Sequence, residues 1–224
     1  MYYIIIGATC AGKDKIASYI IDNYKGFKMI ISTTSRPIRP KESNGVEYYF
    51  VSREDFKRML DNGEFIEYRT YNTFVNGVKD IWYYGLEKKN VGDTSTNYVA
   101  VMDYQGATEF MEYVGREKVV LIYVKSPYRE RYVRNVLRGD FNINEWTRRN
   151  KDDLKWLNNA YKNADSVVLN YGFNFPEIPT ESIDLNTDIE YSPIPPNFEM
   201  TKKQIDHVIR DCENIVRSHK KEAE

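Results

Sequence analysis

The chain has 224 residues, of which 42% are hydrophobic, so it can form one sizeable core with room for inserted subdomains. Its 32 Lys and Arg residues against 33 Asp and Glu residues leave a formal net charge of -1, which argues against a general nucleic-acid or membrane binder. Signal-peptide and membrane-spanning patterns are lacking, and two cysteines without metal-ligand spacing, Cys10 and Cys212, fit a reducing compartment. We therefore expect a cytoplasmic protein in which any anion site is local.

Five short apolar runs predict the strands of a core sheet. They occupy residues 2–6, 27–31, 98–102, 119–124 and 166–169. Strands buried on both faces of a parallel sheet have this nearly continuous apolar pattern, and helix-like segments lie between several of the runs. The pattern predicts a layered α/β core.

Residues 32–85 differ in composition from the rest of the chain. They are rich in Tyr, Asn, Gly and Pro and contain short alternating stretches, which predict an inserted, partly β subdomain. Within this segment Ser52 and Asp55 form a capping box that predicts a helix start, and Asn62 and Gly63 predict its end.

The C-terminal part is predicted to hold a loop and a helix. Residues 173–198 are rich in Pro, Asn, Ser and acidic residues and predict a long loop. A second capping box at residues 201–204 predicts a helix that runs to about residue 218, with an apolar stripe packed on the core. His207 and His219 lack neighbouring metal ligands, and we expect both at the surface.

A phosphate-loop pattern, GxxxxGK, is complete at Gly7, Gly12 and Lys13, between the first predicted strand and a helix-like segment. Such a turn directs backbone N–H groups at an anion, adds the positive end of the helix dipole and lets the lysine reach the outer phosphates. The pattern also arises by chance, but its placement favours a nucleotide site. The loop residues expected around the phosphates are Gly7, Ala8, Thr9, Cys10, Ala11, Gly12, Lys13 and Asp14.

Asp14 stands where the pattern usually has a Ser or Thr hydroxyl that binds Mg²⁺. A carboxylate in the first turn of a helix is favoured by the helix dipole, so Asp14 could be structural. Next to a triphosphate, however, an uncompensated carboxylate would be repelled, whereas Mg²⁺ accepts carboxylate oxygen as a ligand. We therefore favour a role for Asp14 in holding Mg²⁺, directly or through water.

A second group of residues follows the second predicted strand. Arg36 and Arg39 lie three positions apart, Glu42 follows, and Tyr48 comes after an Asn-Gly turn. Arginine forks and hydroxyl groups are suited to bind a second phosphate, although a solvated basic loop would also explain the two arginines taken alone.

This segment resembles the guanylate kinase family, whose pattern runs S-x-T-T-R-x-P-R, then E, then N/D-G-x-x-Y-x-F-V-S. The spacing back from Tyr48 matches without a gap. The resemblance implies that the monophosphate nucleotide is held, mostly at its phosphate, by Ser32, Arg36, Arg39, Glu42 and Tyr48.

The resemblance continues in order along the chain. Glu67 ends a stretch similar to the family's GEFxE and would read the guanine edge, and Tyr84 in Tyr-Tyr-Gly would contact the acceptor phosphate. Asp103 matches the Asp of D-x-Q-G, near the metal and the acceptor. Basic residues outnumber acidic ones in residues 125–151, where Arg134, Arg138 and Arg149 fall in step with the family's lid arginines; Asn170 resembles the strand end beside the adenine pocket.

The resemblance implies a P-loop NTPase-type three-layer α/β fold with a parallel core sheet, an inserted β-rich NMP-binding subdomain and a helical lid. The core would comprise residues 1–32 and 86–224, with the lid at about 128–152 and the subdomain at 33–85. The implied activity is transfer of the γ-phosphoryl group of Mg-ATP to GMP or dGMP, with Lys13 and the three lid arginines as catalytic residues and Mg²⁺ held near Asp14 and Asp103. No nucleic-acid polymer or membrane is an expected partner, and both a monomer and a homodimer stay open.

Four departures from the family pattern bear on this interpretation. Asp14 replaces the loop hydroxyl, a feature also found in some phage deoxynucleoside monophosphate kinases. Leu86 stands where the family has a Ser or Thr that bonds guanine, and leucine cannot make that bond. Val101 replaces the first Asp of D-x-D. Extra residues within 69–82 either reshape the acceptor pocket or extend a hairpin.

Two alternatives follow from these departures. The first is a kinase of the same fold that acts on another (d)NMP, for which Leu86 is the motive. The second is a catalytically silent interaction module, because guanylate kinase-like domains can serve as scaffolds. The second predicts loss of the donor site, yet Gly7, Gly12 and Lys13 are present.

Overall fold

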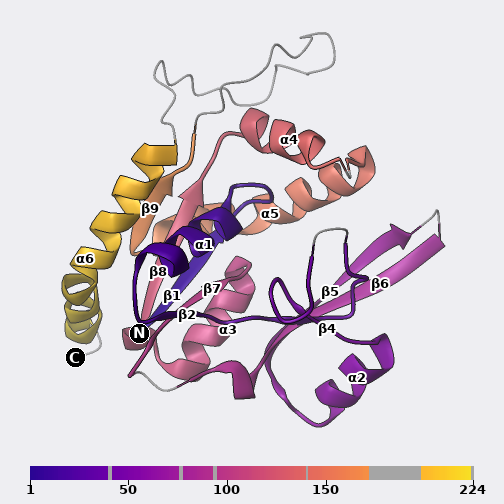
Figure 1. The fold of residues 1–224 in the computed structure, drawn as a ribbon, viewed down its shortest axis with the longest axis horizontal. Coiled ribbons are helices and arrows are strands. Elements are labelled where there is room, and N and C mark those ends of the chain that lie inside the picture. Colours follow the sequence, from indigo (N-terminus) through magenta and orange to yellow (C-terminus); the bar gives the residue numbers. More distant parts are fainter. Residues whose placement is uncertain (40–41, 76–77, 93–94, 140, 172–197, 223–224) are drawn as a thin grey trace.

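The computed structural model describes residues 1–39, 42–75, 78–92, 95–139, 141–171 and 198–222 (Figure 1). The predicted loop at residues 173–198 lies outside the described residues, except for Phe198. None of the helices in these ranges combines the length and apolarity needed to cross a lipid bilayer.

The core is a five-stranded parallel sheet whose strands all come from the predicted apolar runs. Its order is β2 (Phe27–Met29), β7 (Asn97–Val101), β1 (Tyr2–Gly7), β8 (Val119–Lys125) and β9 (Ser166–Leu169). Alternate side chains of β1 enter different clusters, Ile4 and Ile6 on one face and Tyr3 and Ile5 on the other, because successive residues of a strand point to opposite faces. Both faces of β1 are therefore buried, as the continuous apolar pattern predicted.

Helices cover both faces and make the fold three-layered. On one face, α3 (Tyr104–Val114) and α5 (Ile143–Asn163) contribute Phe110 and Ala160 to the core. On the other face, α1 (Lys13–Asn23) and α6 (Phe198–Glu222) contribute Ile20 and Ile205 (Figure 1). The P-loop-type α/β architecture expected from the sequence is confirmed.

A second, four-stranded sheet lies to one side of the core. Its order is β4 (Tyr49–Phe50), β3 (Thr33–Thr34), β6 (Val78–Glu87) and β5 (Phe65–Val75), and β5 and β6 form a long antiparallel hairpin that extends away from the core (Figure 1). The described residues of the segment 69–82 all belong to this hairpin. Helix α2 (Arg53–Asp61) packs beside it, and Ser52 accepts a hydrogen bond from the N–H of Asp55 as its capping box predicts.

The remaining elements complete the connections. Two short 3₁₀ helices, η1 (Lys88–Asn90) and η2 (Arg116–Lys118), precede β7 and β8. Helix α4 (Tyr128–Leu137) follows β8 and leads into α5. The predicted lid therefore corresponds to α4 and the first part of α5, which continues to Asn163.

Two predictions about the C-terminal helix were wrong. Helix α6 begins at Phe198 rather than at Thr201, because Thr201 is fully buried and its hydroxyl donates to the carbonyl of Leu169 at 2.9 Å instead of capping the helix. His219 is buried, with its Nε2 atom 2.6 Å from Asp165 Oδ1, and is not a surface residue. His207 is exposed, as predicted.

Leu86 is part of the hydrophobic core. It is fully buried and belongs to the same core cluster as Ile30, Met102 and Phe110. Its register partner on β5 is Glu67. Leu86 therefore contributes packing where the family pattern has a hydroxyl group.

Candidate active site

The phosphate loop joins the carboxyl end of β1 to the start of α1. A Cβ atom on Gly7 would lie 2.6 Å from the carbonyl oxygen of Val124, and one on Gly12 would lie 2.2 Å from Asn170 Nδ2. Gly12 also has a φ of +93°, which side chains rarely tolerate. The two glycines of the pattern are therefore required by the close approach of β8 and Asn170.

Cationic side chains hold the carbonyl groups of this loop. The bonds run from Lys13 Nζ to the carbonyls of Gly7 (2.8 Å) and Ala8 (3.0 Å), and from Arg134 Nη1 to those of Cys10 (3.2 Å) and Ala11 (3.3 Å). The C=O and N–H of a planar trans peptide point in opposite directions. Two loop N–H groups already have acceptors: that of Thr9 donates to Asp153 and that of Ala11 donates to the carbonyl of Ala8. The N–H groups of Ala8 and Gly12, opposite carbonyls that are turned toward the cations, are therefore left able to face an anion.

Helices α4 and α5 hold the peptide groups of Thr9. Arg131 Nη1 donates to the carbonyl of Thr9 at 3.1 Å, and the N–H of Thr9 donates to Asp153 Oδ2 at 2.7 Å. Burial lowers the pKa of Arg131, and the charge of Asp153 opposes this shift. The sequence analysis missed both residues, because 122 and 144 positions separate them from Thr9 and no local pattern marks them.

Asn170 and Arg134 lie beneath the loop. Asn170 is buried and donates from Nδ2 to the carbonyl of Ala11 at 2.7 Å, while Arg134 Nη2 donates to the carbonyl of Asn170 at 3.1 Å. Arg134 also contacts Glu130 at 3.0 Å. Arg134 thus ties α4 and the end of β9 to the phosphate loop.

Arg36 and Glu42 form a buried ion pair in the predicted acceptor-phosphate site. Arg36 is 3% exposed and donates two hydrogen bonds to Glu42, at 2.9 and 3.0 Å, and Glu42 also accepts the N–H of Arg39 at 2.8 Å. Burial alone would raise the pKa of Glu42, but these bonds lower it. Glu42 therefore orients the side chain of Arg36 and the backbone of Arg39. The carbonyl of Ser32, another predicted acceptor residue, accepts the N–H of Tyr49 at 2.9 Å.

Three arginines from two distant parts of the chain line one pocket. Arg39 comes from the segment before β4, whereas Arg138 and Arg149 come from the predicted lid. Glu145 also lines this pocket and accepts a hydrogen bond from Arg149 Nε at 2.6 Å. The pocket is thus rich in positive charge, as a site for phosphoryl oxygens requires.

The two tyrosines of the predicted acceptor site lie against each other. The rings of Tyr48 and Tyr84 meet edge to face, with centroids 5.7 Å apart. Burial, followed by the charge of Asp14, raises the pKa of Tyr48 to about 12. The charge of the exposed Asp14 in the donor loop therefore acts on a tyrosine of the predicted acceptor site.

The base end of the acceptor site is acidic. Glu67 is 8% exposed, and burial raises its pKa to about 7; Asp103 and Glu109 raise it as well, whereas Arg69 lowers it. A Cβ atom on Gly106 would lie 3.0 Å from Glu67 Oε2, so a glycine leaves room for this carboxylate. The sequence analysis missed Arg69 and Glu109, although Arg69 follows Glu67 by two positions and so shares its face of β5.

The two acids that were predicted near the metal have different surroundings. Asp103 caps α3 by accepting the N–H of Gly106 at 2.7 Å, and its other oxygen accepts the Tyr71 hydroxyl at 3.0 Å. Asp14 has no ion-pair partner among the described residues. In the described ranges no three His, Cys, Asp or Glu residues gather into a metal site.

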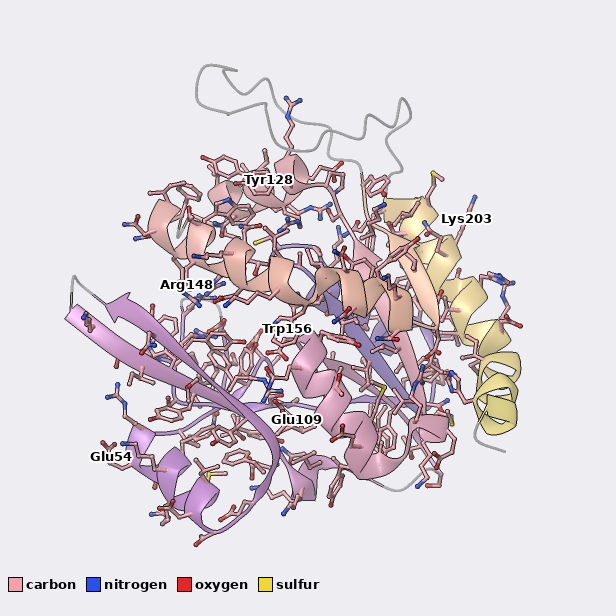
Figure 2. The ribbon with its side chains drawn as sticks, turned by 180° about the vertical axis from the view of Figure 1, so that it is seen from behind. Glu54, Glu109, Tyr128, Arg148, Trp156 and Lys203 are labelled. Carbon is pink, nitrogen blue, oxygen red and sulfur yellow. The ribbon has the colours of Figure 1, made fainter. Side chains whose placement is uncertain are left out.

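Replacing Glu67 with Gln should stabilise the free protein at alkaline pH. The carboxylate ionises near pH 4.5 in the unfolded chain and near pH 7 in the folded chain, so the parent loses stability as pH rises across this interval. We expect Glu67→Gln to exceed the parent by on the order of 3 kcal/mol at pH 8 and by little near pH 4.5, in urea unfolding. The exposed Glu54→Gln on α2 serves as control (Figure 2). A Glu67→Gln protein less stable than the parent at pH 8 would contradict this account.

Comparison with known proteins identifies the family. The sequence model described as guanylate kinase matches residues 1–173. The guanylate kinase of Wigglesworthia glossinidia brevipalpis is 31% identical over 183 residues, 78% of this chain and 82% of that protein. The guanylate kinase of Chromohalobacter salexigens is 28% identical over 176 residues, 77% of each chain.

The fold comparison agrees with the sequence comparison. The crystal structure of guanylate kinase from Anaplasma phagocytophilum matches with a TM-score of 0.56 and 25% identity, over 93% of this chain and 84% of that one. With its phosphate loop, buried Arg36–Glu42 pair and pocket of three arginines, the chain belongs to the guanylate kinase family.

Proposed function

We propose that the protein is a cytoplasmic nucleoside monophosphate kinase that transfers the γ-phosphoryl group of Mg-ATP to GMP or dGMP. The observation that carries this proposal is the pocket in which Arg39 of the acceptor side meets Arg138 and Arg149 of α4–α5. Phosphoryl transfer requires cations around the transferred group and two nucleotides in line. Family membership supports the same activity.

The donor phosphates would bind at the loop between β1 and α1. Its N–H groups and the start of α1 attract anions. Lys13 uses two of its three ammonium hydrogens on loop carbonyls, which leaves one for a phosphate oxygen. Arg134 and Asn170 would act by holding the loop in shape, since their hydrogen bonds go to its carbonyl groups.

The acceptor phosphate would bind beside Arg39, Tyr48 and Tyr84. Arg36 is neutralised by Glu42, so it would add hydrogen bonds and orientation more than net charge. Arg39, Arg138 and Arg149 would then offset the negative charge that develops during transfer. Catalysis would consist of positioning and charge neutralisation, without a covalent intermediate.

Mg²⁺ would be held by phosphate oxygens together with Asp14. The exposed Asp14 carboxylate is a hard oxygen ligand without a competing ion pair among the described residues, and it stands in the first turn of α1 directly after the phosphate loop. When bound, the ion would supply charge neutralisation for the phosphates. Asp103, with both oxygens hydrogen-bonded at the base end, would serve the acceptor.

Glu67 would select guanine. An ionised carboxylate accepts two hydrogen bonds from guanine N1 and N2, whereas adenine has no matching pair of donors. Because Leu86 belongs to the core, discrimination would rest on Glu67 and its neighbours rather than on a hydroxyl at position 86. A kinase that acts on another (d)NMP would not explain the buried Glu67 carboxylate. A catalytically silent module would not explain the pocket of three arginines.

A panel of acceptors tests the proposed function. ADP formation from Mg-ATP would be measured with GMP, dGMP, AMP, CMP and UMP. We expect kcat/KM for GMP or dGMP to exceed that for AMP by at least about 100-fold, because a site built to pair buried polar groups rejects a base that leaves them unpaired. Absence of turnover with every acceptor would refute the kinase assignment, and preference for another base would refute the acceptor assignment.

Variants of Asp14 test its proposed role with Mg²⁺. We expect Asp14→Ala to lower kcat about 10- to 100-fold and to raise the Mg²⁺ concentration needed for half-maximal rate, since a charge-assisted contact is lost. Asp14→Ser should keep most of the activity, because a hydroxyl is also a magnesium ligand. Asp22→Ala, exposed on the same helix, is the matched control. Activity of Asp14→Ala equal to that of the control at every Mg²⁺ concentration would exclude the role.

A further inference from the structure

The β5–β6 hairpin contributes an arginine to the base end of the acceptor site. Glu67, Arg69 and Tyr71 lie at alternate positions of β5 and therefore share one face. Arg69 is the register partner of Tyr84, which belongs to the predicted phosphate site. Arg69 thus lies two positions from Glu67 of the base end, and opposite Tyr84 of the predicted phosphate site.

Arg69 lies among three carboxylates. The ion-pair distances are 3.9 Å from Nη1 to Glu67 Oε2, 3.6 Å from Nε to Asp103 Oδ1 and 3.1 Å from Nη2 to Glu109 Oε1. Its side chain is 15% exposed, and Glu67 is buried more deeply. Arg69 is the cation that the described residues place within 4 Å of Glu67.

The three acids come from different elements. Glu67 is on β5, Asp103 caps α3, and Glu109 is on α3, labelled in Figure 2. The backbone of Leu86 on β6 adds a hydrogen bond to Glu67. The Tyr71 hydroxyl donates to Asp103 Oδ2. The guanidinium carbon of Arg148 on α5 lies 5.4 Å from the centre of the Tyr71 ring. Mutual repulsion among carboxylates in this confined site would disfavour their charged forms without a counter-charge.

The geometry of Arg69 suits a shared counter-charge. Nε and Nη2 are buried without a well-directed hydrogen bond, although carboxylate oxygens lie near both. The closest of the three acids is Glu109, whose Oε2 accepts a hydrogen bond from Arg69 Nη1 at 3.1 Å while its Oε1 lies 3.1 Å from Nη2. Glu67 and Asp103 lie farther away, at 3.9 and 3.6 Å, where the guanidinium acts on them through its charge. It can balance all three acids by charge.

We propose that Arg69 is a positioning residue for acceptor selection, which holds the Glu67 carboxylate charged and aligned to accept two N–H groups from a guanine-type base. This inference rests on the proposed function. Arg69 acts through Glu67, so its effect depends on the presence of the Glu67 carboxylate. It compensates in part for Leu86, which provides no side-chain contact to the base.

Steady-state kinetics of variants at positions 67 and 69 test the proposal. We expect Arg69→Gln to raise the KM for GMP about 10- to 100-fold, the usual loss for a charged hydrogen-bonding partner, with the KM for ATP unchanged. Arg69→Lys should recover much of the loss, because it keeps the charge. In the Glu67→Gln background, Arg69→Gln should change the KM for GMP less than twofold, because coupled residues are not additive.

The matched control is Arg53→Gln. Arg53 of α2 pairs with Asp80 of the same hairpin, and its side chain is 41% exposed. We expect this variant to match the parent in both KM values. Thermal melts of every variant separate folding defects from binding defects.

Each outcome bears on the proposal. Equal KM values for GMP in Arg69→Gln and the parent, or the same Arg69→Gln effect with and without Glu67, would overturn it. If Arg69→Gln alone fails to fold, folding of the double variant Glu67→Gln/Arg69→Gln supports it, since the uncompensated acid is gone, and failure of both overturns it. A parent without acceptor-dependent turnover would overturn the proposed function and this inference together, whereas an active parent isolates the role of Arg69.

Discussion

The hydrogen bonds that hold the carbonyl groups of the phosphate loop are the constraint on which the rest of the site depends. Lys13, Arg131 and Arg134 provide them, so the loop is bound to α1 and α4 at once. Asn170 adds a bond from the end of β9, and Thr201 of α6 supports Asn170 and Leu169. The donor site, the predicted lid and the C-terminal helix are therefore joined through one loop of the chain.

The acceptor side is organised by opposite charge balances at its two ends. At the phosphate end Arg39, Arg138 and Arg149 gather around one pocket, with Glu145 bound to Arg149. At the base end three carboxylates surround Arg69. A guanine monophosphate has N–H donors at its base and negative oxygens at its phosphate, so on the proposed function this polarity would orient the acceptor with its phosphate at the arginine pocket.

Local patterns predicted much of the fold and part of the site. The strands, the capping box at Ser52 and the glycine loop depend on neighbouring residues, and the structure has them where the sequence indicated. Thr201 and His219 were misjudged because contacts with Leu169 and Asp165 override local preference. Arg131 and Asp153 depend on contacts with Thr9 across more than a hundred positions, which a single sequence does not reveal. The proposed role of Arg69 as a counter-charge depends on Asp103 and Glu109 of α3, and no sequence pattern shows that α3 lies against β5.

On the proposed function both nucleotide sites open on one arginine-lined pocket, where Arg39 meets Arg138 and Arg149. The most direct test is the affinity, by calorimetry, of a bisubstrate analogue in which adenosine and guanosine are joined through a chain of five phosphates. The account predicts binding at least about 100-fold tighter than that of ATP or GMP alone, because linked ligands share one entropic cost, and a loss of this gain in Arg39→Gln. Binding of the analogue no tighter than that of ATP would contradict the account.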